Sequence, residues 1–431
     1  MINNIYLSPK ATEFDKLCQR PKKEVQSLEK VISEIFEKVK NDGDSGLREL
    51  TKQYDNVALE GLAIARQELM NAKEAVPEKL RQAINTAYTN IRKFHKEQLP
   101  TDLNIEIQDG VTCSQRAIPI ERVGLYIPGG TAPLFSTVLM LAVPAQLAGC
   151  KELILCTPPD ANGNINQAIL YAADLCGITQ IYKVGGAQAI AAMTLGTESI
   201  LRVAKIFGPG NQYVTAAKAY AAKYNVAMDM PAGPSELLVY ADDSAVPAFV
   251  AADLLSQAEH GTDSQVILVT KSEQMVTQVN QALELQLPIL PRAEIAAETL
   301  ENSRAVVVEE VKEAWRFINQ YGPEHLIIAS ENPDQYVDFV INAGSVFLGN
   351  YCPESAGDYA SGTNHTLPTD GWAHSYSGLN IDAFLRKVTF QSITKEGLLK
   401  LGPTIETMAL GEQLQAHANA VTLRINALND K

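Results

Sequence analysis

The sequence lacks several features that would each point to a particular class of protein. Its six cysteines are scattered over 431 residues and none stands in a C-x-x-C pair, so neither a zinc ribbon nor a disulfide framework is indicated. No apolar run approaches the ~18 uncharged residues of a membrane span, and no basic segment precedes an apolar run at the N-terminus. These absences predict a protein of the reduced cytoplasm that does not enter a membrane.

Positive charge is also in short supply. The chain has 36 Lys and Arg against 50 Asp and Glu, a net charge of -14 at pH 7. Nucleic acids and anionic membranes select a basic face that neutralises phosphates, so we expect neither as a partner. Apolar residues make up 46% and charged residues 20%, which indicates a folded chain of two to three domains at ~150 residues each.

Common nucleotide-binding and hydrolytic signatures are missing as well. The absence of P-loop, G-x-S-x-G and H-E-x-x-H patterns weakens nucleoside triphosphatase, α/β-hydrolase and zincin interpretations. GPGNQY and GGAQAI lack the last glycine of G-x-G-x-x-G, so a standard Rossmann turn is not predicted. Glycine turns between strands and helices nevertheless recur, and the amides of a helix N-terminus would accept a pyrophosphate. These residues alone neither establish nor exclude a phosphate-containing ligand.

Helical periodicity begins the chain, and an alternation of strands and helices follows. Residues 25–98 carry the one-sided apolar stripes of amphipathic helices. From Val123, short apolar runs, glycine turns and helical segments alternate, and the alternation resumes after a Pro- and Gly-rich hinge at 229–236. This pattern predicts two parallel α/β layers with ligand loops at the C-terminal ends of the strands, followed by a helical C-terminus over 394–428.

Two pairs of polar side chains are placed where they could carry chemistry. Gln257 and His260 stand i, i+3 at the end of a predicted helix and could hold one metal ion, but His260 could equally cap the helix. Glu324 and His325 stand just before an apolar strand, where an acid and a base suit proton transfer. A solvated pair in a loop is the plainer interpretation of the second pair, because successive strand residues face opposite ways.

Two further pairs lie nearer the C-terminus. Asp358 and His365 occur in a glycine- and serine-rich loop, a composition found both at sites and on plain surfaces. His417 lies on a predicted helix with Glu412 five residues earlier, ~140° away around an ideal helix. Those two side chains would not share a face, so they would need different roles in any common site.

Taken together, six motifs closely resemble the histidinol dehydrogenase family and come in that family's order. They are VGLYIPGGTAPLFSTVLMLAVPAQLAGC, GPGNQYVTAAK, DMPAGPSELLV, DLLSQAEHG, YGPEHL and SVFLGNYCPES. The resemblance covers the chain from the first helices to the last. It implies oxidation of L-histidinol through L-histidinal to L-histidine, with reduction of two NAD molecules, as the last steps of histidine biosynthesis.

The resemblance also implies a metal site and a substrate site. It assigns one zinc ion to Gln257, His260, Asp358 and His417, where the ion is not redox active and orients the imidazole and amine of the substrate. Ser235, His365 and Glu412 match further substrate contacts, beside the zinc ligands and the acid–base pair.

Catalytic and nucleotide-binding roles follow from the same resemblance. His325 matches the base that takes the hydroxyl proton, and Glu324 matches the group that activates water for the aldehyde step. The nucleotide contacts of the family fall on Tyr126, Gln188 and Asn211. No motif position with an assigned role departs from the family's pattern.

The fold implied by the resemblance is a domain-swapped homodimer of two incomplete Rossmann-like α/β domains per subunit and a small helical tail. Segment 1–24 would pack with the tail, and 25–127 with 236–380 would form a discontinuous catalytic domain. Residues 128–235 would bind NAD, and 381–431 would form the dimerisation tail. Each active site would then be shared, with His417 and Glu412 coming from the partner.

Two alternatives from other functional classes stay open. A zinc hydrolase would use the same ligand set but would leave the GPGN and GGAQ turns without a purpose. A regulatory relative without activity would keep the fold, yet we would expect it to have lost Glu324, His325 or a zinc ligand.

Overall fold

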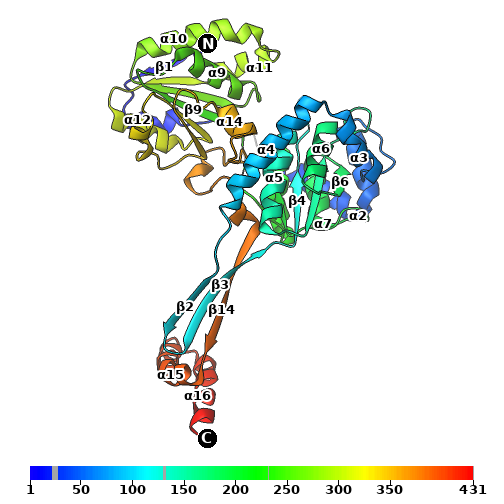
Figure 1. Cartoon of the computed structure of the whole chain (residues 1–431), viewed down its shortest axis with the longest axis vertical. Coiled ribbons are helices and arrows are strands. Elements are labelled where there is room, and N and C mark those ends of the chain that lie inside the picture. The colour runs from blue at the N-terminus through cyan, green and yellow to red at the C-terminus, as the bar shows by residue number, and fades with distance from the viewer. Residues whose placement is uncertain (22–27, 130–132, 232, 431) are drawn as a thin grey trace. The chain divides into compact units, whose positions relative to one another are not determined.

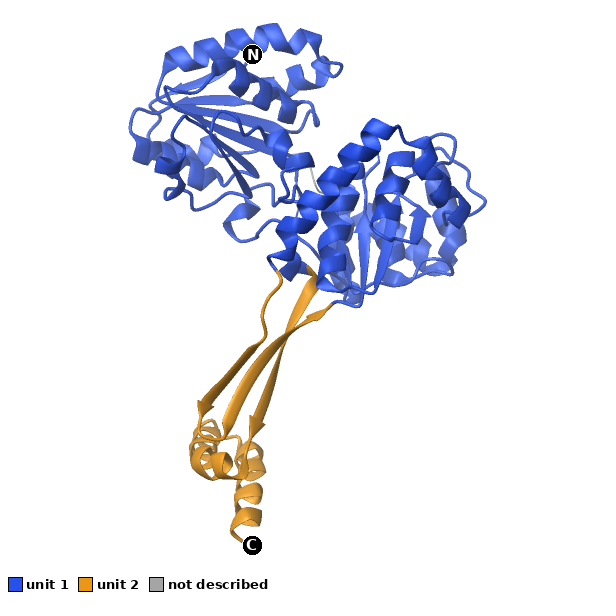
Figure 2. Cartoon of the chain, viewed as in Figure 1, with its two compact units in different colours: residues 1–98, 120–383 blue, residues 99–119, 384–431 orange. Residues whose placement is uncertain are grey.

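The computed structural model describes residues 1–21, 28–129, 133–231 and 233–430. It divides into two compact units (Figure 2): unit 1 comprises residues 1–98 and 120–383, and unit 2 comprises residues 99–119 and 384–431. Unit 1 contains two parallel sheets, here named sheet A and sheet B. None of the helices in the described ranges is long and apolar enough to cross a membrane.

Sheet B is the five-stranded parallel sheet of unit 1, with the strand order β6-β5-β4-β7-β8. Its strands are β4 (Arg122–Tyr126), β5 (Glu152–Thr157), β6 (Gln180–Lys183), β7 (Lys205–Phe207) and β8 (Ala227–Met228). They alternate with α5 (Phe135–Ala148), α6 (Gln167–Leu175), α7 (Gly186–Leu195) and α8 (Gln212–Ala221), as Figure 1 shows. The predicted alternation from Val123 is therefore confirmed as a parallel layer.

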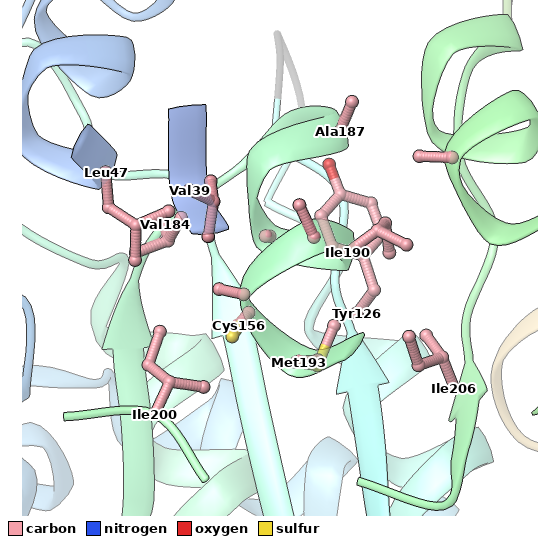
Figure 3. Close-up of a cluster of buried hydrophobic side chains, with 14 of the residues drawn as sticks. Val39, Leu47, Tyr126, Cys156, Val184, Ala187, Ile190, Met193, Ile200 and Ile206 are labelled. Atoms are coloured by element: carbon pink, nitrogen blue, oxygen red, sulfur yellow. The ribbon is translucent and has the colours of Figure 1, made fainter. Parts of the chain in front are cut away.

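Three N-terminal helices complete the layer around sheet B. They are α2 (Leu28–Tyr54), α3 (Arg66–Ala75) and α4 (Glu78–Lys96). Helix α2 packs on α7 and α8, α3 on α6, and α4 on α5. In Figure 3, Val39 and Leu47 of α2 lie beside Val184, in one buried cluster with Ile190 and Met193 of α7.

This packing corrects the predicted division of the chain. We assigned 25–127 to the same domain as 236–380, whereas the structure places α2, α3, α4 and β4 with sheet B. An apolar stripe shows that a helix is buried but does not say against which sheet, and the assignment failed for that reason. The predicted boundary between residues 24 and 25, and residue 232 of the hinge, lie outside the described residues.

Sheet A is the six-stranded parallel sheet, with the order β1-β11-β10-β9-β12-β13. Its strands are β1 (Asn4–Leu7), β9 (Glu236–Ala241), β10 (Gln265–Thr270), β11 (Arg304–Val307), β12 (His325–Ala329) and β13 (Ser345–Leu348). The helices around it are α1 (Phe14–Leu17), α9 (Pro247–Ala258), α10 (Glu273–Gln286), α11 (Ala293–Glu301), α12 (Val311–Tyr321), α13 (Asp334–Val337) and α14 (Glu354–Tyr359). Segment 1–24, expected to pack with the tail, instead supplies β1, whose residues pair with β11. An exposed four-residue edge strand gives too little periodicity to predict.

Unit 2 combines two distant segments in an antiparallel sheet of order β14-β3-β2 with two helices. Its elements are β2 (Leu103–Gln108), β3 (Val111–Pro119), β14 (Leu385–Ile393), α15 (Lys395–Gly411) and α16 (Gln415–Asn429). We predicted a purely helical tail and placed 99–119 in the catalytic domain. Every residue of β2 is exposed, so no burial pattern identified the strand in the sequence.

Short 3₁₀ helices connect these elements. They are η1 (Ala11–Glu13), η2 (Ala222–Tyr224), η3 (Leu287–Ile289), η4 (Trp372–His374) and η5 (Ile381–Phe384).

Candidate active site

The predicted acid–base pair lies at the amino end of sheet A. Glu324 immediately precedes β12 and His325 is its first residue, beside the first residues of β9. The pair stands before its strand, as the sequence predicts, and so lies at the opposite end of the sheet from the ligand loops that we expect at the carboxyl ends of the strands. The turn after α12 that delivers Glu324 to the sheet is formed by Gly322 with φ at 59° and by Pro323.

Main-chain groups of Glu236 hold both members of the pair. The Glu236 N–H donates to Glu324 Oε2 at 2.9 Å, and His325 Nδ1 lies 3.2 Å from the Glu236 carbonyl oxygen. Glu324 is 6% exposed and His325 is 4% exposed, so the pair is not a solvated loop. His325 Nδ1 is 3.7 Å from Glu324 Oε2, which brings an acid and an imidazole together away from bulk water.

Helix α14 adds two carboxylates around the same imidazole. Glu354 Oε1 lies 3.2 Å from His325 Nδ1, and Asp358 Oδ1 lies 3.7 Å from His325 Nε2. Glu354 also accepts a hydrogen bond from the Ser256 hydroxyl at 3.2 Å. Our sequence reading treated this stretch as a loop and missed Glu354. The available signal was Pro353 at a helix start followed by two acids spaced i, i+4, which places both on one helix face.

Burial and charge raise the pKa values of both buried glutamates and of the histidine in this cluster. Burial raises the pKa of Glu324 to about 8 and that of Glu354 to about 8. Burial lowers the pKa of His325, but the carboxylates of Glu354, Glu324 and Asp358 outweigh it and raise the value to about 10. Groups with displaced pKa values concentrate at catalytic sites, where they take part in proton transfer.

Gln257 and His260 come from the C-terminal end of α9. Gln257 is fully buried, and both its amide oxygen and its amide nitrogen lack a hydrogen-bond partner among the described residues. A buried amide left unsatisfied costs about 1–3 kcal/mol, so this side chain is built to meet a ligand. His260 has an exposed side chain and interacts electrostatically with Asp358, His325 and His365.

His365 and Ser235 lie at the edges of this cluster. His365 Nδ1 is 2.8 Å from the Asp358 carbonyl oxygen, and its Nε2 is 3.2 Å from the Thr137 hydroxyl of α5. Ser235 is half-buried, precedes Glu236, and accepts a main-chain hydrogen bond from Gln265 at 3.2 Å.

The remaining residues of the predicted metal and substrate site belong to unit 2. Glu412 ends α15, His417 lies in the first turn of α16, and Gln413 between them has φ at 62°. The helix therefore breaks between the two residues, and the ~140° separation expected on a single helix does not apply. Both side chains are exposed. No group of three or more His, Cys, Asp or Glu side chains forms a metal site within the described ranges.

The three predicted nucleotide contacts line one pocket of about 990 Å³ at the carboxyl end of sheet B. Tyr126 is the last residue of β4, and its hydroxyl, directed toward the first turn of α7 in Figure 3, accepts from the Gly186 N–H at 3.0 Å. Asn211 caps α8 by accepting from the main-chain N–H groups of Tyr213 and Val214, both at 3.1 Å. Sequence reasoning thus brought together residues that the fold also brings together.

The pocket carries negative charge without basic side chains. Asp55 and Asp160 line it, and no Lys or Arg occurs among its described lining residues. Gln188 Nε2 donates to Asp55 Oδ2 at 3.4 Å, and burial raises the pKa of Asp55. The N-termini of α7 and α8 border the same pocket, an arrangement that suits an anion such as a pyrophosphate.

The fold and these sites define an α/β enzyme with a buried acid–base cluster on one parallel sheet and a ligand pocket on another. A sequence profile of the histidinol dehydrogenase family matches residues 18–425. A histidinol dehydrogenase of Bacteroides thetaiotaomicron is 54% identical over 97% of this chain and 98% of its own, and one of Vibrio vulnificus is 49% identical over 99% and 98%. The crystal structure of histidinol dehydrogenase from Elizabethkingia anophelis, 54% identical, superposes with a TM-score of 0.96 over 99% of this chain and 98% of that one.

The chain therefore belongs to the histidinol dehydrogenase family. It is an oxidoreductase, its substrate is histidinol, and it oxidises histidinol in histidine biosynthesis.

Proposed function

We propose that the protein is a cytoplasmic, zinc- and NAD-dependent enzyme that oxidises L-histidinol through L-histidinal to L-histidine in two hydride transfers. The observation that carries the proposal is the buried Glu324–His325 pair, together with the buried and unsatisfied amide of Gln257 on α9. None of the six cysteines, all of which lie in described ranges, forms a disulfide, which supports the cytoplasmic assignment.

The metal site would consist of Gln257, His260, Asp358 and His417. These residues offer imidazole nitrogen, carboxylate oxygen and an amide atom that has no protein partner, a donor set that fits zinc. A bound zinc ion would orient the imidazole and the amine of the substrate. Ser235, His365 and Glu412 would add the further substrate contacts.

His325 would serve the first oxidation. In the neutral imidazole, with Nδ1 donating toward the Glu236 carbonyl and Glu354, Nε2 is the nitrogen left to accept the hydroxyl proton of histidinol. Because the neighbouring carboxylates raise the pKa of His325 to about 10, the population of this neutral form grows as the pH rises above neutrality. As that proton moves to Nε2, the C–H bond of the carbinol carbon breaks and the hydride leaves for NAD. Nε2 has no hydrogen-bond partner among described residues, so it can meet the substrate without first losing one.

Glu324 would serve the second oxidation. A carboxylate that takes a proton from water lets the water oxygen bond to the aldehyde carbon, and the hydrated aldehyde then gives a hydride to a second NAD. One water and two NAD are consumed, and the carboxylate of L-histidine is released. The raised pKa of Glu324, about 8, makes it a stronger base than an exposed glutamate.

NAD would bind in the pocket of sheet B, against Tyr126, Gln188 and Asn211. The N-terminal amides of α7 and α8 would face its pyrophosphate. Bound there, NAD would supply the hydride acceptor for both half-reactions.

Two chains would form a homodimer in which unit 2 of one chain completes the site of the other. Glu412 and His417 are exposed, which supports a role outside their own unit. Unit 2 also exposes many large apolar side chains, which favours a protein partner. They are Leu103, Ile105, Ile107, Phe390, Met408, Leu410, Leu414 and Leu423.

The stoichiometry of NADH tests the overall reaction. We expect two NADH for each histidinol consumed, loss of turnover after dialysis against a strong chelator, and recovery with added zinc. The chelated protein should still bind NAD, because the nucleotide contacts lie on the other sheet. A protein that forms no NADH would favour a hydrolase or a regulatory relative, and full activity at near-zero metal content would exclude the zinc site.

Complementation in mixed dimers tests the shared site. His260→Ala and His417→Ala chains should each be nearly inactive alone, because every site lacks a ligand. After mild unfolding and joint refolding, mixed dimers contain one intact site, and activity should return to at most about a quarter of the unmodified level. If well-mixed, folded heterodimers remain inactive, His417 acts within its own chain and the shared site is excluded.

A further inference from the structure

One residue outside the assigned machinery touches both members of the acid–base pair. The Glu236 N–H donates to Glu324 Oε2 at 2.9 Å, and the Glu236 carbonyl oxygen lies 3.2 Å from His325 Nδ1. A shift of this residue would therefore move both groups at once. The contacts that hold Glu236 in place therefore also fix the positions of Glu324 and His325.

The side chain of Glu236 is held by a buried ion pair with Arg20. Arg20 Nε lies 2.5 Å from Glu236 Oε1, and its Nη2 donates to Oε2 at 2.9 Å, so the guanidinium grips both oxygens. The two side chains are 13% and 3% exposed. The Asp370 N–H donates to the same carboxylate at 2.8 Å, and the Asp370 carboxylate lies 3.9 Å from Arg20 Nε.

Arg20 also holds the turn that leads to the acid–base pair. Its Nη2 donates to the Tyr321 carbonyl at 2.8 Å, and its guanidinium carbon lies 4.0 Å above the centre of the Tyr321 ring. Tyr321 is the last residue of α12, three residues before Glu324. A single planar side chain thus connects the start of β9 with the approach to β12.

We propose that Arg20 is a positioning residue, whose guanidinium fixes the Glu236 peptide and the Tyr321 turn so that Glu324 and His325 keep their catalytic geometry. The proposal builds on the acid–base roles given above. Arg20 does not touch the reacting atoms; it acts through Glu236.

The geometry requires a guanidinium and not simply a positive charge. Lysine can neutralise Glu236 but offers a compact ammonium, which cannot grip both carboxylate oxygens while stacking on Tyr321. A misplacement of about 1 Å costs an active site up to about 100-fold in rate. Burial raises the pKa of Glu236 and Arg20 opposes that shift, so Arg20 favours the charged form of the carboxylate.

The test compares Arg20→Lys with Arg304→Lys as a matched control. Arg304 anchors the same N-terminal segment, through the carbonyls of Leu17 and Gln19. Its charge acts on the Tyr321 hydroxyl, but among the described residues it makes no hydrogen bond or ion pair with Glu236 or with the Tyr321 carbonyl. Both variants weaken the anchoring of that segment. Only Arg20→Lys alters the support of the acid–base pair.

We expect Arg20→Lys to lower kcat about 10- to 100-fold in single-turnover NADH formation on both histidinol and histidinal. The KM for NAD should stay within about twofold of the unmodified enzyme, and Arg304→Lys should leave kcat within about twofold at a similar melting temperature. Arg20→Lys at unmodified kcat would overturn the proposal. An equal loss of kcat in both variants would overturn it too, because the effect would then be structural.

A paired substitution covers the case in which Arg20 variants fold poorly. Arg20→Met with Glu236→Gln removes both buried charges, so neither is left unpaired, and the double variant should fold. Its kcat should stay at least about tenfold low, and full kcat would contradict the proposal. Glu324→Gln separates the two hypotheses: if that variant keeps full activity, the acid–base assignment fails, whatever the Arg20 variants show.

Discussion

Sheets A and B are both parallel and both flanked by helices, yet their predicted site residues lie at opposite ends of the strands. In sheet B, Tyr126 ends β4, and Gln188 and Asn211 follow β6 and β7. In sheet A, Glu324 and His325 stand where β12 begins. Different helix ends reach the two places. In sheet B they are the N-termini of α7 and α8. In sheet A they are the C-termini of α9 and α12, joined by the N-terminus of the six-residue helix α14, whose Glu354 contacts His325.

This difference matches the charge of the proposed ligands. A helix N-terminus carries partial positive charge and favours anions, whereas a C-terminus favours cations. The pocket of sheet B thereby suits a pyrophosphate. The site of sheet A, with Glu354 and Asp358 added from α14, suits a metal ion and the ammonium of an amino alcohol. The rule that ligands bind at the carboxyl ends of parallel strands holds for one sheet only.

The largest effect should come from Glu324→Gln in the site of sheet A. Loss of the water-activating carboxylate should lower histidinal oxidation by about 10²- to 10⁴-fold, with a much smaller loss for histidinol oxidation. Single-turnover NADH bursts on each substrate measure the two steps separately, and NAD affinity should not change. Equal losses in both steps would show that the two residues do not divide the half-reactions.

Gly208→Ala should impair NAD binding at sheet B and leave histidinol binding at sheet A unchanged. Gly208 has φ at 128°, and a Cβ there would lie 2.1 Å from the Tyr126 carbonyl oxygen, so the backbone beside the pocket must shift. We expect the KM for NAD to rise about tenfold or more while the KM for histidinol stays near its unmodified value. Gly61→Ala is the control, since a Cβ there meets nothing within 4 Å. A rise confined to the histidinol KM would break the separation of the two sites.

Asp55→Asn tests whether the negative charge of the sheet B pocket selects between NAD and NADP. The pocket has two carboxylates and no described basic lining residue, so it should reject the extra phosphate of NADP. Removing one charge should shift the ratio of kcat/KM for NADP over NAD upward by about tenfold. Asp174→Asn, an exposed change on α6 outside the pocket, should leave the ratio unchanged. If both variants behave alike, Asp55 has no part in nucleotide selection.

The smallest effect concerns stability near the site of sheet A. Burial raises the pKa of Asp253 on α9 from 3.8 to about 7. The folded chain therefore holds a proton that the unfolded chain releases, and this carboxyl lowers the free energy of unfolding as the pH rises from about 4 to 7. Asp253→Asn should remove that loss and gain roughly 2 kcal/mol relative to the unmodified protein by pH 7. Urea titrations at several pH values measure the difference, with the exposed Asp243→Asn as control; a pH-independent difference would refute the assignment.

The periodic parts of the fold could be predicted from the sequence, and the non-local parts could not. Strands such as β9 and β10, buried at every residue, read as apolar runs between turns, and the predicted parallel layers are confirmed. Strand β2 is exposed throughout and β1 pairs with a segment 300 residues later in the chain. Neither leaves a local signal, because their partners and not their own pattern determine them.

The candidate site also has residues with a local sequence signal and residues whose contacts are non-local. Gln257 with His260 and Glu324 with His325 are close in sequence, so spacing alone drew attention to them. Arg20 and Glu236 are 216 residues apart, and their contact depends on how the N-terminal segment meets sheet A. Whether the zinc, substrate and nucleotide residues act as assigned stays a prediction that the experiments above test.

The pairing of β1 with β11 has a consequence for synthesis on the ribosome. Residues 4–7 emerge first but cannot pair until residues 304–307 have been made, a wait of about 15 to 60 s at 5–20 residues per second. The strands of sheet B all lie within residues 122–228, so that layer can close while sheet A still lacks its edge. Arg20 and Glu236, 216 residues apart, can become neighbours after about 11 to 43 s at the same rate. The layer of sheet B, with its pocket, can therefore form on the ribosome before the Glu324–His325 pair of sheet A has its full support.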